Sequence, residues 1–114
     1  MKKIQIIQKL FDKASIKADT SEEGIGVAIL NRNGRLVYAV EINHRDNIAR
    51  LYHYGTRTID YDIRQGIILG WYGESVSDRD SMNTFLDCLG DEENYFRYGP
   101  VMGFVHEFRD SAYS

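Results

Sequence analysis

The sequence has 114 residues, of which 43% are hydrophobic and 27% are charged, and its formal net charge is −3. These values are ordinary for one folded domain, so we expect residues 1–114 to form a single domain and exclude a disordered or fibrous chain. No stretch reaches the roughly 18 consecutive apolar residues of a membrane span. Cys88 is the only cysteine, so an internal disulfide is excluded. We therefore predict a cytoplasmic protein that has no membrane partner.

The first predicted element is a helix over residues 3–15. Ile4, Ile7, Leu10 and Ala14 recur at the spacing that places apolar side chains on one face of a helix. This stripe predicts that the helix packs against a sheet or a second helix.

A β-hairpin is the clearest local signal. Two β-rich runs, residues 25–30 and 36–42, flank Asn33-Gly34, a dipeptide typical of a two-residue type I′ turn. With the turn at this position, one face collects six large apolar residues, and we expect that face to point toward the core. These residues are Ile25, Val27, Ile29, Tyr38, Val40 and Ile42.

Further strands are predicted over residues 48–54, 56–61 and 66–72, where β-branched and aromatic residues cluster between glycines. The strands follow one another through short turns, which favours an antiparallel sheet.

A second helix is predicted over residues 78–89. Ser77 with Asp80 resembles a capping box, and Gly90 suits the C′ position after a helix. The aromatic stretch 95–98 and residues 101–108 then read as one or two last strands. The predicted class is α+β, with an N-terminal helix and an antiparallel sheet of about five or six strands.

Catalytic signals are weak. The three histidines, His44, His53 and His106, lie at no zinc-ligand spacing with Cys88 or with one another. The sequence contains neither a phosphate-binding loop nor a serine-nucleophile elbow. We therefore predict no cofactor and no bound metal, and favour a protein that is not an enzyme.

Charge is distributed unevenly along the chain. Residues 1–57 carry ten Lys or Arg against six Asp or Glu, whereas residues 58–114 carry four against eleven. Acidic partners, including nucleic acid, are disfavoured by the net charge, and a basic protein surface is the expected partner. The candidate binding residues are the carboxylates of the second helix with nearby aromatic anchors: Glu74, Asp78, Asp80, Asp87, Asp91, Glu92, Glu93, Tyr95 and Tyr98.

The segment from Leu51 to Phe85 resembles a pattern in short proteins of phages and mobile elements. It contains Tyr52-x-Tyr54-x-Thr56, a following strand that ends in Gly70-Trp71-Tyr72, and a serine-capped helix. The resemblance implies a small binding protein, in some cases an inhibitor of host defence nucleases.

The leading functional prediction is a non-catalytic protein-binding module, of the kind in which a phage inhibitor docks its acidic face on a nucleic-acid-binding host protein such as a CRISPR nuclease. The alternative is a small enzyme or small-molecule binder with a pocket lined by Tyr52, Tyr54, Trp71 and a histidine. Homodimerisation through sheet edges is a third alternative.

Overall fold

A computed structural model describes residues 2–99 and 103–109 of the chain. Its two helices and seven strands confirm the α+β class and the N-terminal helix. In chain order they are α1 (Lys3–Thr20), β1 (Ile25–Arg32), β2 (Arg35–Asn43), β3 (Ile48–His53), β4 (Thr56–Asp62), β5 (Ile67–Trp71), α2 (Val76–Cys88), β6 (Asn94–Gly99) and β7 (Gly103–Phe108). Of the predicted last strand, Val101 and Met102 lie outside the described residues.

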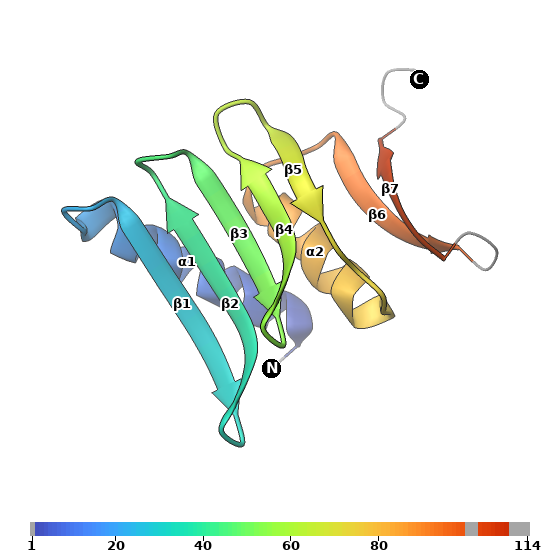
Figure 1. The fold of residues 1–114 in the computed structure, drawn as a ribbon, viewed down its shortest axis with the longest axis horizontal. Helices are drawn as coiled ribbons and strands as arrows, with labels where there is room; N and C mark the ends of the chain where they lie inside the picture. Colours follow the sequence, from blue (N-terminus) through green and yellow to red (C-terminus); the bar gives the residue numbers. More distant parts are fainter. Residues whose placement is uncertain (1, 100–102, 110–114) are drawn as a thin grey trace.

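Strands β1 to β5 form one antiparallel sheet in chain order, and β6 and β7 form a separate hairpin. Both helices lie behind the five-stranded sheet, α1 across β1 and β2 and α2 behind its other half (Figure 1). The core fills the space between the layers and is built from the fully buried side chains of Ile7, Val40, Leu51, Ile59 and Phe85. Burial of these apolar surfaces drives the docking of the helices.

The turn of the first hairpin lies where the sequence predicts it, but the inward face predicted for β1 is wrong. Asn33 and Gly34 have positive φ angles of 54° and 75°, as a type I′ turn requires. A bulge between Leu30 and Asn31 then shifts the register by one residue.

Because of this shift, Ile29 lies opposite Ala39 rather than Tyr38. The side chains of Ile25, Val27 and Ile29 therefore point away from the helices, and those of Val27 and Ile29 are 45% and 54% exposed. On β2, Tyr38, Val40 and Ile42 are buried as predicted.

The close approach of α1 explains why β1 turns its small residues inward. Gly26 and Ala28 face the helix, where Ala14 and Ala18 are also small and buried. A Cβ atom on Gly26 would lie 2.0 Å from the carbonyl oxygen of Ala14 and 2.5 Å from the backbone nitrogen of Ala18. Only glycine allows the strand and the helix to pack at this distance.

A charge ladder crosses the opposite face of the sheet, which no described element covers (Figure 1). Arg50 on β3 lies between Glu41 on β2, at 3.7 Å, and Asp60 on β4, at 3.1 Å. The three residues are direct cross-strand partners, so their charges alternate across the sheet and stabilise its register.

Lys17 occupies the free edge of β1. The carbonyl of Gly24 accepts a hydrogen bond from the backbone nitrogen of His44, so by the alternation of an antiparallel ladder the carbonyl of Val27 points away from β2. The ammonium group of Lys17 donates a hydrogen bond of 3.0 Å to that carbonyl oxygen.

The β6–β7 hairpin is anchored to the sheet by aromatic rings. The Trp71 ring lies 5.2 Å from that of Phe96 and 5.3 Å from that of Phe104, measured between ring centres. The Phe104 ring lies close over Gly73, directly before the loop that enters α2. These contacts place Trp71 against the hairpin, and it does not line the His-containing pocket in which the alternative functional prediction places it.

Candidate functional site

The candidate site is built around His53, the last residue of β3. Its imidazole is only 7% exposed and is stacked between the rings of Tyr38 and Tyr54, each with its centre 4.4 Å away. Aromatic stacking on both sides fixes the plane of the imidazole.

Asp78 in the first turn of α2 holds the His53 ring from the edge, with 2.6 Å between Nδ1 and Oδ1. The other carboxylate oxygen of Asp78 accepts the backbone N–H groups of Glu74 and Ser75, and the Ser75 hydroxyl accepts the N–H of Asp78. Ser75, rather than the predicted Ser77, is therefore the N-cap of α2. Burial raises the pKa of Asp78, but these hydrogen bonds outweigh burial and lower it.

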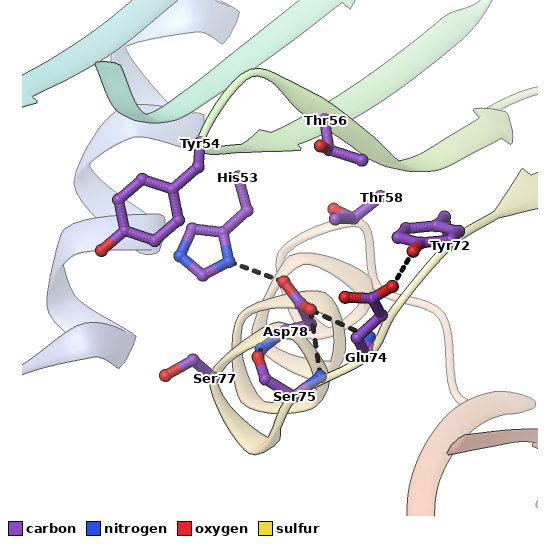
Figure 2. A pocket seen from close by; sticks show the side chains of 9 residues that line it. All are labelled: His53, Tyr54, Thr56, Thr58, Tyr72, Glu74, Ser75, Ser77 and Asp78. Atoms are coloured by element: carbon purple, nitrogen blue, oxygen red, sulfur yellow. Dashed lines mark hydrogen bonds and ion pairs between the residues drawn. The ribbon is translucent and has the colours of Figure 1, made fainter. Parts of the chain in front are cut away.

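A pocket of about 360 Å³ opens beside this pair, and we call it the His53 pocket. It lies between the β3–β4 turn and the loop from β5 into α2 (Figure 2). Its lining comprises His53, Tyr54, Thr56, Thr58, Tyr72, Glu74, Ser75, Ser77 and Asp78. A histidine and Tyr54 thus line a pocket as the alternative function predicts, whereas Tyr52 lies on the opposite face of β3, between the buried Leu51 and His53.

Tyr54 has an unusual backbone conformation at this pocket. It has a φ of 50° and forms the two-residue β3–β4 turn with Gly55. The left-handed conformation costs a residue with a Cβ atom about 1–2 kcal/mol. The stack on His53 holds the Tyr54 ring in place while 66% of the residue stays exposed.

The acidic segment after α2 has a different organisation, with Asp91 at its centre. The Asp91 carboxylate is buried and accepts four hydrogen bonds, from the Tyr61 hydroxyl, the backbone N–H groups of Glu93 and Asn94, and the Asn94 amide. Burial raises the pKa of Asp91, but the hydrogen bonds outweigh it and lower the pKa. Burial and the bond to Asp91 raise the pKa of Tyr61.

This hydrogen-bond network shapes a second groove of about 510 Å³, which we call the Asp91 groove. It runs between the β4–β5 turn (63–66) and the α2–β6 loop (89–93). Ile63 and Leu89 supply apolar surface, while Glu92 and Glu93 are exposed. Arg64 also lines the groove.

The C-terminal end of α2 adds to the negative potential there. Its last turn has no basic residue, although cations are the charges that a helix C-terminus favours. The Asp87 side chain is 68% exposed, and its nearest cation, in Arg109, is 3.8 Å away.

The nine predicted binding residues do not form one continuous patch. Asp87, Asp91, Glu92 and Glu93 lie at the C-terminal end of α2. Of the other five, Glu74 and Asp78 line the His53 pocket, Asp80 is bonded to Arg79 and shares a groove with Asp87, Tyr95 donates to Glu107, and Tyr98 is 47% exposed on β6. The two ends of the 13-residue α2 are about 20 Å apart.

Each of the other histidines has its own partner. His44 bonds Asp19 at 2.8 Å, and His106 bonds Asn94 at 2.9 Å. Within residues 2–99 and 103–109, no three His, Cys, Asp or Glu side chains gather closely enough to hold a metal ion. The Cys88 thiol has a pKa raised to about 11, first by burial and then by the charges of Asp12 and Asp87.

Comparisons with protein-family models, with curated proteins and with solved structures found no match to this chain. Among the described residues, neither helix has the length and apolar character needed to cross a membrane. Two of the concave sites, the His53 pocket and the Asp91 groove, combine carboxylates with aromatic or apolar side chains.

Proposed function

We propose that this chain is a non-catalytic protein-binding module that binds a basic segment of a partner protein in the Asp91 groove. The observation that carries the proposal is the fixed loop: four hydrogen bonds hold the Asp91 carboxylate, and the loop then presents Glu92 and Glu93 to solvent. A loop that is already ordered loses little conformational entropy on binding.

Charge and apolar surface together define the expected ligand. Carboxylates from Glu92 and Glu93 attract lysine or arginine side chains, and Ile63 and Leu89 offer contact to an apolar neighbour. Asp87 extends the acidic surface along the helix end, with the guanidinium of Arg109 3.8 Å away. Such complementarity mainly raises association rates and specificity.

The more specific proposal is that the basic partner is a nucleic-acid-binding protein, with the carboxylates standing in for phosphates. The resemblance of residues 51–85 to short phage proteins supports this choice, and a host defence nuclease, including a CRISPR nuclease, is the expected kind of target. Excess DNA or RNA should then compete with the chain for its partner.

Charge reversal with a matched control tests the groove. The variant Glu92→Lys/Glu93→Lys should lower affinity for a peptide of alternating lysine and leucine by at least about tenfold. Glu22→Lys/Glu23→Lys makes the same charge change at two exposed residues outside both sites, and it should bind as the wild type does.

The measurement is an NMR titration of the labelled protein, with circular dichroism to verify that each variant is folded. The expected amide shifts fall in residues 63–66 and 89–93. The same three proteins are then used to capture partners from host lysate. Equal peptide affinity and equal captured proteins for all three would show that the groove is not the binding surface.

A further inference from the structure

The His53 pocket holds negative charge that its own lining does not neutralise. Glu74 and Asp78 supply two carboxylates, and no lysine or arginine lines the pocket. Both oxygens of Asp78 are bonded to His53, Glu74 and Ser75. The ammonium group of Lys3 borders the pocket at Ser77, whose hydroxyl accepts a hydrogen bond from it, and its carboxylate partner is Asp80, at 3.8 Å, rather than Glu74 or Asp78.

Glu74 is the carboxylate of the pocket that is only partly hydrogen-bonded. One of its carboxylate oxygens accepts the Tyr72 hydroxyl, and its second oxygen has no donor among the described residues. The Thr56 hydroxyl is exposed and likewise has no hydrogen-bond partner within the described part of the chain. A ligand could therefore bind these groups without breaking a bond of the fold.

Two exposed aromatic rings line the pocket. Figure 2 shows Tyr72, from the loop after β5, beside Glu74, and Tyr54, from the β3–β4 turn, on the far side of His53 from the Asp78 carboxylate. They are 49% and 66% exposed, respectively. Tyrosine faces attract cations, and the attraction adds to that of a neighbouring carboxylate.

The backbone conformation of Tyr54 is an independent indication of a role for its ring. The β1–β2 turn has Asn33 at the equivalent position, with a φ of 54° against 50° for Tyr54. Asparagine adopts this conformation readily, whereas an aromatic residue does so rarely. A strained residue at the edge of a pocket is a reason to look for function there.

We propose that the His53 pocket binds an organic cation, a guanidinium or ammonium group on an aliphatic stem. Glu74 and Thr56 bind the cationic group, the ring of Tyr72 contacts it, and the exposed ring of Tyr54 beyond His53 contacts the aliphatic stem. An anion would meet two carboxylates, and a neutral apolar ligand would leave Glu74 desolvated and unpaired. The volume of about 360 Å³ suits a ligand of amino-acid size.

This site is independent of the Asp91 groove, at the other end of α2. The cation can come from a lysine or arginine side chain of a bound protein or from a free amine. Three probes separate these sources: Nα-acetyl-arginine methylamide, its citrulline counterpart, which is neutral and nearly isosteric, and agmatine, a free guanidinium amine.

NMR titration of the full chain provides the test. We expect saturable shifts of the amides of residues 53–56 and 72–78 with the arginine probe or agmatine, and none with the citrulline probe. Glu74→Gln keeps an acceptor for Tyr72 and should weaken binding about tenfold. Glu22→Gln removes an exposed carboxylate outside both sites and should leave binding unchanged.

Tyr54→Asn is the second variant because it suits the turn and removes the ring, together with its stack on His53. It should stay folded and bind about threefold more weakly. Tighter binding of the arginine probe than of agmatine would assign the site to a partner's side chain, and the reverse order to a free amine. Equal binding of the citrulline probe, or unchanged affinity in Glu74→Gln, would overturn the proposal and leave the Asp91 groove unaffected.

Discussion

The contact between α1 and β1 leads to a quantitative prediction for Gly26→Ala. The new Cβ would lie 2.0 Å from the Ala14 carbonyl oxygen, so α1 would have to retreat by about 1.4 Å to reach the 3.4 Å of an ordinary contact. The obstructing atoms belong to the helix backbone, and no side-chain rotation relieves them. We expect a loss of about 3 kcal/mol in the free energy of unfolding, at the upper end for an overpacked core.

Urea unfolding followed by circular dichroism measures this loss, and thermal unfolding should show a melting temperature about 10 °C lower. Gly70→Ala is the matched control, because it makes the same change in a strand where no atom lies within 4 Å of the new Cβ. It should change stability by less than about 1 kcal/mol. A cost for Gly26→Ala no larger than that for Gly70→Ala would refute the close packing of α1 on β1.

Two further predictions concern titrating groups. The pKa of Asp91 is lowered in the folded protein from its ordinary value of 3.8, so its stabilising effect is complete above that value and is lost as the pH falls through the folded pKa. Urea midpoints measured from about pH 6 down to pH 3 should therefore fall less in Asp91→Asn than in the wild type. Asp78 contributes in the same direction in both proteins, so it does not cancel this difference. Parallel curves would contradict the assignment. The Cys88 pKa rises from 9.0 to about 11, so native Cys88 should react with iodoacetamide about a hundredfold more slowly than in urea near pH 8. Equal rates, measured by mass spectrometry, would show that the thiol is not shielded.

Local signals in the sequence predicted the elements well, and contacts between distant residues explain what was missed. The Asn33-Gly34 turn and the second helix were found because their chemistry lies within a few residues. The pattern of large apolar residues predicts the wrong inward face for β1, because small residues face the helix there. The matching small residues, Gly26 on the strand with Ala14 and Ala18 on the helix, were the available signal for a close approach.

The candidate sites depend on partners far apart in the chain. The sequence places Asp78 among the partner-binding carboxylates, yet its side chain bonds His53, which lies 25 residues earlier. Asp91 likewise bonds Tyr61, 30 residues earlier. No spacing rule brings such pairs together. A local signal for the His53 pocket did exist in Tyr54-Gly55, because an aromatic residue is unusual in a two-residue turn.

The hydrogen bond from Lys17 to the Val27 carbonyl has a consequence for solubility. An outer strand with unpaired carbonyls can act as a template for strands of other molecules, and natural proteins often block it with a lysine. Here a single ammonium group fills that position on β1, beside the exposed side chains of Val27 and Ile29. Acetylation of Lys17 would remove the charge and leave this edge more open to pairing with a strand of another molecule.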